Sequence, residues 1–348
     1  MHVCTIPTEE PESDGTAEWD STTIVVVEAR ADGAAGIGNT YCEAAAAELI
    51  RSKLASLVHE DVRASWLAMN GAVRNAGRPG IAACAISAVD QALWDLKARR
   101  LGTSLVDVLG AAHDDVPVYG SGGFCSYSDV RLAEQLGGWA AGGIPRVKMK
   151  IGREPERDPA RLDAARSAVG DDVELFVDAN GAFTAKTALA WAERFALEWN
   201  VSWFEEPVSS ADFDGLRLVR EQGPAGVEIA AGEYAYVAAD FRNIVGCVDV
   251  LQADVTRCGG ITGLLTVSGL ANAHGTDVSA HCAPAISAHA FCAVERRRHL
   301  EYFHDHVRIE AMLFDGVVEP VGGVLRPDRS RPGNGLALKR KEIERWTA

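Results

Sequence analysis

Two kinds of hydrophobic pattern alternate along the second part of the chain, starting near Val116. Short runs rich in β-branched and aromatic residues, bounded by turn residues, are typical of buried strands. Segments whose apolar residues recur every three or four positions, such as Asp158–Val169 and Thr184–Trp199, are typical of helices. The strand runs are VPVYGSGGF, RVKMKIG, VELFVDAN, VSWFEEP, VEIAAGE, VDVLQAD, DVSAHC and HLEYF. Eight strands alternating with helices favour a parallel (β/α) barrel over a doubly wound open sheet.

The first part of the chain has strands followed by a run of helices. Thr22–Arg30 has the pattern of a strand, and a second short strand is predicted near GIGNTYC. Helices are predicted over EAAAAELIRSKLASLV, VRASWLAMNGAV and Ile81–Ala98, with Gly102 as a helix stop. We therefore predict an α+β domain at residues 1–115 and the barrel at 116–318. The Gly-, Pro- and Arg-rich tail at 319–348 is predicted to return to the first domain.

The balance of charges limits the classes of partner. The chain of 348 residues has 34 Lys plus Arg and 49 Asp plus Glu, which gives a net charge of −15. Such an acidic surface argues against nucleic acid and anionic membranes as partners. No apolar run approaches the roughly 20 residues that a membrane-spanning helix needs. A small anionic substrate stays compatible with this charge, because a local basic site can lie within an acidic surface.

Cysteine usage and the N-terminus indicate the compartment. Eight cysteines occur without a CxxC pair, and several lie in apolar runs. Buried, reduced thiols are the expected state. The N-terminal segment carries acidic residues where a signal peptide needs positive charge and an apolar core. We therefore expect a cytoplasmic protein.

Charged and polar side chains stand at the ends of the predicted barrel strands from the second to the eighth. In strand order they are Lys148 and Lys150, Asp178 and Asn180, Glu205 and Glu206, Glu233, Asp254, His281 and Glu301. The carboxyl ends of parallel strands form one face of a barrel, and barrel enzymes have their active sites at that face.

Three of these acids follow the period of one strand–helix unit. Glu205 lies 27 residues after Asp178, and Glu233 lies 28 residues after Glu205. Three converging carboxylates repel one another unless a cation lies between them, and ligation by oxygen alone suits Mg²⁺ or Mn²⁺ better than zinc. A single acid of this set could be a solvated strand end or a helix cap, but the regular spacing of all three favours a metal site.

The ordered motifs KMK, VDAN, FEEP, AAGE, QADVTRCGGITG, SAHCAP and HLEYF resemble the enolase superfamily, in its mandelate racemase-like subgroup of acid-sugar dehydratase type. The resemblance covers nearly the whole chain and implies an α+β capping domain over a (β/α)7β barrel. It implies Asp178, Glu205 and Glu233 as the metal ligands and Lys150 as the base. It also implies an Asp254–His281 dyad and an acid, Glu301, at the end of the eighth strand.

The two lysines explain how a base could work here. Lys148 and Lys150 lie two positions apart in a strand, so their side chains share one face. A neighbouring cation and burial both lower the pKa of an ammonium group, and a lysine accepts a proton only when it is neutral. We expect Lys148 to lower the pKa of Lys150 and to bind a substrate carboxylate oxygen. Without the other strand-end residues, the simpler interpretation is that both lysines extend to solvent at the end of the strand.

The remaining strand-end residues are expected to act with this base. His281 would face Lys150 across the barrel mouth, while Asp254 would hold its other ring nitrogen. Glu301 would donate a hydrogen bond to the intermediate if burial keeps it protonated. The alternative for Glu301 is a structural ion pair with Arg297 or Arg298.

Several further residues are predicted to support the site. Asn180 and Glu206 are expected to hold the metal ligands from behind. His304 and His306 could form a metal site of their own, but structural hydrogen bonding is favoured because they directly follow the eighth strand. The substrate-binding candidates are Ser13, Asp14, Thr16 and Ser121.

The polar loop Pro11–Thr16 contains three of these substrate-binding candidates. The family places a mobile substrate-covering loop here, whereas a disordered terminus is the alternative. Only about six residues precede the loop, so the first strand of the capping domain is expected to be short.

These residues predict proton abstraction next to a carboxylate. The enolase superfamily is a known example in which a lysine or histidine base works with one or two Mg²⁺ ions that stabilise an enediolate. Bases on both sides of the carbon allow dehydration of an acid sugar to a 2-keto-3-deoxy acid, which the polar loop favours. They equally allow racemisation or epimerisation of a 2-hydroxy acid, which is the alternative.

Two other classes share such a barrel, a catalytically idle binding protein and a zinc hydrolase. The intact set of strand-end residues argues against the first. The second would need histidines at strand ends where the chain has Gly122 and Gly123. The resemblance further implies a homo-oligomer, from a dimer to an octamer.

Overall fold

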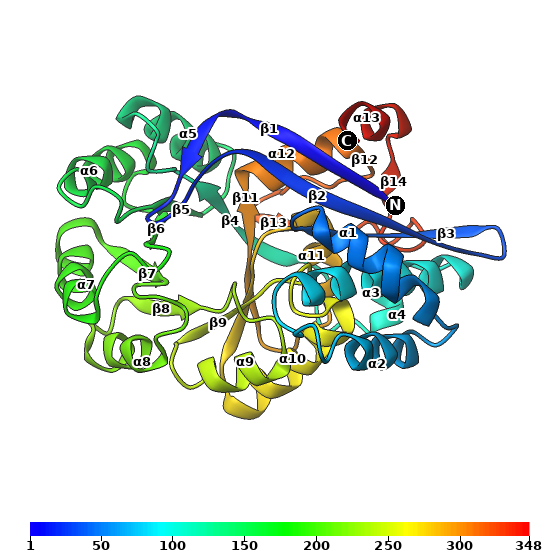
Figure 1. Cartoon of the computed structure of the whole chain (residues 1–348). Coiled ribbons are helices and arrows are strands. Elements are labelled where there is room, and N and C mark those ends of the chain that lie inside the picture. The colour runs from blue at the N-terminus through cyan, green and yellow to red at the C-terminus, as the bar shows by residue number, and fades with distance from the viewer. Residues whose placement is uncertain (348) are drawn as a thin grey trace.

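The chain begins with a three-stranded antiparallel sheet in the order β1 (His2–Ser13), β2 (Glu18–Ala31) and β3 (Ala34–Tyr41). The computed structural model describes residues 1–347. Side chains along β2 alternate between two cores. Ile24 and Val26 join the core of the barrel, whereas Val25 and Val27 join a separate core among the first helices. The sheet therefore lies between these helices and the barrel, and β2 passes over the barrel region (Figure 1).

The first strand is longer than expected, and this corrects the prediction of a short first strand. β1 pairs with β2 past a register shift between Pro7 and Glu12, and the pairing continues to Ser13. Proline has no N–H to donate to a ladder, so Pro7 and Pro11 account for an interruption at this place. Only residues 14–17 connect the two strands, and Asp14 is buried.

Six helical segments follow the sheet, and the helix predicted near residues 43–58 is divided among the first three. The segments are α1 (Ala45–Leu49), the π-helix η1 (Ile50–Leu54), the 3-10 helix η2 (Ala55–Leu57), α2 (Val62–Ala72), α3 (Ile81–Arg100) and α4 (Leu105–Leu109). Helix α3 packs directly on β3. A side chain at Gly36 or Gly38 would overlap the backbone oxygen of Ala92 or Ala88, so this close approach requires glycine.

Eight parallel strands then close into a barrel, as the sequence predicted. They are β4 (Val116–Gly122), β5 (Arg146–Lys150), β6 (Glu174–Asp178), β7 (Val201–Glu205), β8 (Glu228–Ala231), β9 (Val250–Ala253), β10 (Asp277–Ala280) and β11 (Arg297–Phe303). Each strand pairs with the next one, and β11 pairs in parallel with β4.

Seven helices connect the barrel strands, which gives the (β/α)7β order. They are α5 (Asp129–Ala141), α6 (Asp158–Val169), α7 (Ala185–Trp199), α8 (Phe213–Gln222), α9 (Ala238–Ile244), α10 (Gly260–His274) and α11 (Pro284–Phe291). The helices lie around the strands (Figure 1). The barrel with its separate N-terminal sheet domain has the architecture that the resemblance implied.

Aromatic side chains form a layer beneath the carboxyl ends of the strands. Tyr119, Phe176 and Trp203 are buried together with Ala230 and Val250. The Trp203 indole N–H donates to Glu205 Oε2 at 3.0 Å, and Lys148 Nζ lies 5.4 Å from the centroid of the Tyr119 ring. This aromatic layer supports the charged side chains of Glu205 and Lys148 from below.

The chain after the barrel returns to the first sheet. Its elements are α12 (His304–Leu313), β12 (Phe314–Asp315), β13 (Val324–Leu325), β14 (Ala337–Leu338) and α13 (Arg340–Trp346). Helix α13 contacts β1, and Arg340 forms an ion pair with Glu28 of β2. The exact boundaries at residues 115 and 318 stay predictions. None of the helices described for residues 1–347 has the length and apolar character that crossing a bilayer requires.

Candidate active site

A cavity of about 330 Å³ lies at the carboxyl ends of the barrel strands. Lys150, Glu233 and His281 line it from the barrel, and Trp19 and Thr22 line it from the first sheet. A larger cavity of about 1220 Å³ lies in the first domain and is lined only by residues between Met1 and Leu101. We assign the active site to the smaller cavity, because buried titratable groups from many strands converge there.

On the lysine side, Lys150 and Glu301 line the cavity, and the fully buried Lys148, Asp178 and Glu205 lie next to them without lining it. Lys148 Nζ lies 2.6 Å from Glu205 Oε1, 2.7 Å from Glu301 Oε1 and 3.2 Å from Asp178 Oδ2. Lys150 Nζ donates to Asp178 Oδ2 at 2.6 Å. All five groups are buried, so the opposite charges compensate one another away from water.

This arrangement differs from the expected effect of Lys148 on Lys150. Burial lowers the pKa of Lys150 and Lys148 lowers it further, but the Asp178 carboxylate at 2.6 Å raises it to a net value above the ordinary one. The pKa of Lys148 is likewise raised, because Glu205 and Glu301 outweigh its burial. The carboxylates in direct contact therefore decide the protonation of both lysines, and the repulsion between the lysines is the weaker effect.

The histidine side of the cavity comprises His281, Asp254 and Glu233. His281 Nδ1 lies 2.8 Å from Asp254 Oδ2, and Nε2 lies 2.9 Å from Glu233 Oε2. The other oxygen of Asp254 accepts bonds of 2.7 Å from the N–H and the hydroxyl of Thr256, which fixes the carboxylate. Burial lowers the pKa of His281, but Cys282, Glu233 and Glu301 raise it well above the ordinary value. An imidazolium is thus stabilised here, with Nε2 facing the cavity.

Glu301 connects the two sides of the cavity as an ionised acceptor. Its Oε1 accepts a 2.6 Å hydrogen bond from Ser121 Oγ and pairs with Lys148. Burial raises the pKa of Glu301, but Lys148 and His281 lower it well below the ordinary value. The two cations in this position therefore favour the ionised form of Glu301, which accepts hydrogen bonds. Donation of a hydrogen bond from protonated Glu301 to an intermediate stays a prediction.

The alternative ion pairs of Glu301 are not formed. Arg297 pairs with Asp115, and Arg298 pairs with Glu228 and Asp277. The separate metal site at His304 and His306 is not formed either. His306 stacks on Tyr41 with 3.3 Å between the ring centroids, and its Nδ1 accepts the N–H of Ala283.

The donor set at the ends of β6, β7 and β8 fits a hard divalent cation. Asp178 and Glu205 are partners in the register of adjacent strands, and Glu233 lies two residues beyond β8. Asn180 Oδ1 and Glu206 Oε1 are buried near them without a hydrogen-bond partner. Such oxygen-rich surroundings suit Mg²⁺. Asn180 and Glu206 also have positive φ angles of 45° and 38°, a strained conformation that is typical of functional sites.

The four substrate-binding candidates differ in their positions. Asp14 lines the cavity, and its Oδ1 accepts the N–H groups of Thr16 and Ala17. The Thr16 hydroxyl donates to the backbone oxygen of Asn180, which ties the turn to the barrel. Ser13 is buried and its backbone oxygen accepts the N–H of Cys125. Within residues 1–347, only Asp14 of the four contributes to the wall of this cavity.

The sequence patterns did not single out several residues of the cavity. Arg257 lies 3.4 Å from Asp254 Oδ2 and donates to the backbone oxygen of Glu233. Its position three residues after Asp254 was a usable signal. Cys282, next to His281, was another. The residues that β2 and β3 contribute, Trp19, Ser21, Thr22, Thr23 and Tyr41, give no local signal because only the docking of the two domains brings them here.

Comparison with known proteins agrees with this architecture. The family model described as enolase C-terminal domain-like matches residues 130–342. The N-terminal domain model of mandelate racemase/muconate lactonizing enzyme matches residues 3–110. A mandelate racemase/muconate lactonizing enzyme-like protein from Rubrobacter xylanophilus has 59% identity and a TM-score of 0.98, over 100% of this chain and 98% of its own.

The relatives with named activities include a cycloisomerase and a dehydratase. The 3,6-anhydro-alpha-L-galactonate cycloisomerase of Streptomyces coelicolor is 34% identical over 98% of this chain and 95% of its own length. The L-talarate/galactarate dehydratase of Salmonella typhimurium is 32% identical over 93% of this chain and 82% of its own length. The crystal structure of that dehydratase with Mg and L-lyxarohydroxamate has a TM-score of 0.90 at 28% identity, covering 100% of this chain and 91% of the other. The chain belongs to the mandelate racemase/muconate lactonizing enzyme family of the enolase superfamily.

Proposed function

We propose that this enzyme removes the proton α to the carboxylate of an acid sugar and eliminates the β-hydroxyl, which yields a 2-keto-3-deoxy acid. The observation that carries the proposal is the convergence of Lys150 and His281 on one cavity, from β5 and β10. Asp178, Glu205 and Glu233 stand at the ends of β6, β7 and β8, which lie between these two strands in the barrel. Similarity to an acid-sugar dehydratase across most of the chain supports the same class of substrate.

Asp178, Glu205 and Glu233 would hold Mg²⁺. When bound, the cation would stabilise the charge that develops on the substrate carboxylate and offset the carboxylates that raise the pKa of Lys150. Lys148, which pairs with Glu205 and Glu301, would bind a substrate carboxylate oxygen. Asn180 and Glu206 would orient the ligands from behind.

The two proton-transfer groups have different tasks in this proposal. Lys150 Nζ accepts the α-proton, which requires it to be neutral when the substrate is bound. His281 Nε2 donates a proton to the departing β-hydroxyl, and its raised pKa suits an acid. Asp254 at 2.8 Å stabilises the imidazolium before the transfer and keeps the proton of the neutral ring on Nδ1 afterwards.

Two other outcomes use the same first step. A 1,1-proton transfer between Lys150 and His281 would give racemisation or epimerisation of a 2-hydroxy acid. Cycloisomerisation is the second alternative, and the 34% identity to a cycloisomerase across nearly the whole chain favours it as a candidate. All three reactions begin with loss of the α-proton, so the fate of the β-substituent distinguishes them.

The test is a screen of acid sugars and their anhydro and lactone forms with Mg²⁺ in D2O. Formation of a 2-keto-3-deoxy acid with loss of water supports dehydration. Deuterium at the α-carbon with inversion and no keto acid indicates a racemase or epimerase. A keto acid formed from an anhydro or lactone substrate without loss of water indicates a cycloisomerase. Deuterium exchange in none of these compounds would contradict the proposal.

A further inference from the structure

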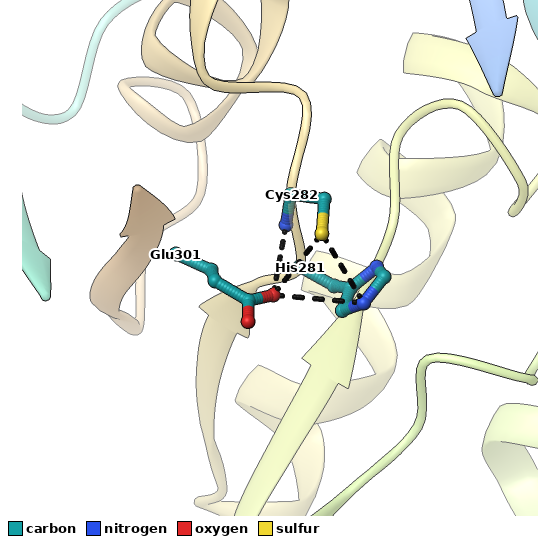
Figure 2. Close-up of side chains that lie close together, drawn as sticks. All are labelled: His281, Cys282 and Glu301. Atoms are coloured by element: carbon teal, nitrogen blue, oxygen red, sulfur yellow. Dashed lines mark hydrogen bonds and ion pairs between the residues drawn. The ribbon is translucent and has the colours of Figure 1, made fainter. Parts of the chain in front are cut away.

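Cys282 creates a second group of potential metal ligands in the cavity, beside the carboxylates assigned to Mg²⁺. His281, Cys282 and Glu301 are the one set of three His, Cys, Asp or Glu side chains in residues 1–347 whose ligand atoms lie within 4.8 Å of one another. All three side chains are buried, and all three line the cavity. Figure 2 shows the imidazole, the thiol and the carboxylate pointing toward one another.

We propose that His281, Cys282 and Glu301 form a binding site for a thiophilic divalent cation, with Zn²⁺ as the cation that fits best. Cysteine and histidine ligands select Zn²⁺ over Mg²⁺, whereas oxygen ligands alone favour Mg²⁺. One cavity would then hold two neighbouring sites of different ligand chemistry. A cation on His281 Nε2 blocks that nitrogen, so Zn²⁺ is expected to inhibit the enzyme.

The distances among the three ligand atoms fit tetrahedral coordination. His281 Nε2 lies 3.3 Å from Cys282 Sγ and 3.5 Å from Glu301 Oε2, and the last two atoms lie 3.2 Å apart. Zinc bonds of about 2.0–2.3 Å at tetrahedral angles separate neighbouring ligand atoms by about 3.3–3.6 Å. The cation can therefore replace the thiol proton with little movement of the side chains.

Each ligand is held in place through an atom that does not face the cation. Asp254 binds the Nδ1 of His281 at 2.8 Å, the carboxylate–histidine arrangement common in metal sites. Ser121 and Lys148 hold Oε1 of Glu301, while Oε2 accepts the backbone N–H of Cys282 at 3.2 Å and has a second lone pair for the cation. The positive φ of 51° at Cys282 turns the chain so that two consecutive residues face one point.

The chemistry of binding is a ligand exchange. The S–H bond of Cys282 and the Nε2–H bond of the His281 imidazolium break, and sulfur–metal and nitrogen–metal bonds form in their place. Both protons pass to the solvent, including the Nε2 proton that lies toward Glu233 Oε2 at 2.9 Å. Nothing is oxidised or reduced. The fourth coordination position faces the cavity and is available to water or to a substrate hydroxyl, as in zinc sites that keep one open position.

The experiment uses Co²⁺ as a spectroscopic probe in the full-length, Mg²⁺-saturated protein. Sulfur ligation gives thiolate-to-cobalt charge-transfer absorption, whereas Co²⁺ on oxygen ligands does not. The wild-type protein is expected to show this band, and Cys282→Ser is expected to lose it. Cys42→Ser is the matched control, since Cys42 lines the same cavity outside the group, and it should keep the band.

A titration of activity with Zn²⁺ measures the consequence for the enzyme. Residues behind metal ligands alter affinity about 10- to 100-fold, so loss of the thiol ligand should raise the half-inhibitory Zn²⁺ concentration by at least about 100-fold. Circular dichroism of Cys282→Ser and Cys282→Ala checks that both variants fold.

Absence of the band in the wild type, or its loss in Cys42→Ser alone, would overturn the proposal. The spectrum needs no substrate, so it succeeds or fails independently of the proposed dehydration. Only the inhibition by Zn²⁺ rests on that function.

Discussion

The lysine side and the histidine side of the cavity use buried charge in different ways. On the lysine side, Lys148 and Lys150 contact Asp178, Glu205 and Glu301 at distances of 2.6–3.2 Å. Every charge there has an opposite partner in direct contact. On the histidine side, a single imidazole has Asp254 on one ring nitrogen and Glu233, Glu301 and the Cys282 thiol around the other.

This difference suggests a division of tasks. The lysine side is a network of fixed charges, so a change in one member alters the protonation of the others. The histidine side concentrates several possible proton partners around one nitrogen, which suits transfer of a proton to or from a ligand. Loss of Lys150 should therefore prevent the first chemical step, whereas loss of His281 should affect a later one.

The largest effect is expected for Lys150→Ala. Removal of the base should lower the turnover of an acid-sugar substrate by about 10⁴-fold, the upper end of the range for general acid–base catalysis. The α-proton should also stop exchanging with D2O, as measured by NMR. Lys186→Ala, at an exposed position in α7, is the control and should keep wild-type activity. Full activity of Lys150→Ala on a confirmed substrate would contradict the assignment of the base.

His281→Asn should separate the two sides of the cavity. We expect the formation of keto acid to fall by about 10³-fold, while Lys150 continues to exchange the α-proton with solvent. The ratio of deuterium incorporation to product, measured by NMR and mass spectrometry, therefore rises. His274→Asn, at an exposed position at the end of α10, controls for loss of a histidine. If exchange stops in His281→Asn and persists in Lys150→Ala, the two roles are reversed.

Asp254→Asn should have a smaller effect on the histidine side. His281 keeps its 2.9 Å contact with Glu233 but loses the acceptor that holds its Nδ1 proton. We expect turnover to fall by about 100-fold, by analogy with the losses of about 10- to 100-fold seen when the residue behind a metal-bound histidine is changed. The pH–rate profile should shift at the same time, because Asp254 raises the pKa of the imidazole. A fall in activity with an unchanged profile would mean that Asp254 only maintains the local fold.

Repeating strand patterns made the barrel and the strand-end residues predictable. Asp178, Glu205 and Glu233 recur once in each strand–helix unit, so their convergence follows from the fold. The charge states were not predictable, because they depend on contacts across the barrel. Lys148, for example, pairs with Glu301, which is 153 positions away in the sequence. The two meet because the last barrel strand closes on the first.

The first sheet was likewise only partly predictable, because its contacts join positions that are distant in the sequence. The pairing of β1 with β2 joins residues 24 positions apart at its start (His2 and Val26) and 7 positions apart beyond the register shift (Glu12 and Trp19). The prolines in β1 are unfavourable in a strand, so the local sequence did not predict its full length. Trp19 and Thr22 reach the cavity only because this sheet docks on the barrel. The Cys282 thiol was adjacent to a predicted residue, yet its contact with Glu301 required the turn that follows β10.

The smallest effect is expected for a buried histidine that lacks the carboxylate partners of His281. His289 in α11 is buried like His281, but its Nδ1 has no hydrogen-bond partner. Burial lowers the pKa of His289 to about 4, and the charge of Asp328 offsets only part of this. An unfolded histidine titrates near pH 6.5, so the unfolded state binds more protons between about pH 4 and pH 6.5. Stability should therefore fall as the pH decreases through this window.

The expected size of this loss is about 3 kcal/mol, from a difference of about 2.5 pKa units at about 1.4 kcal/mol each. His289→Gln removes the titrating group, so unfolding of the wild type and of the variant, compared at pH 7 and at pH 4.5, should isolate its contribution. The wild type should lose more stability than His289→Gln on acidification, whereas His59→Gln, at an exposed site, should behave like the wild type. Parallel curves for all three proteins would show that His289 gains a proton without unfolding. In that case burial would not lower the pKa of His289 below that of an unfolded histidine. The presence or absence of carboxylate partners would then not explain why His281 and His289 differ in protonation.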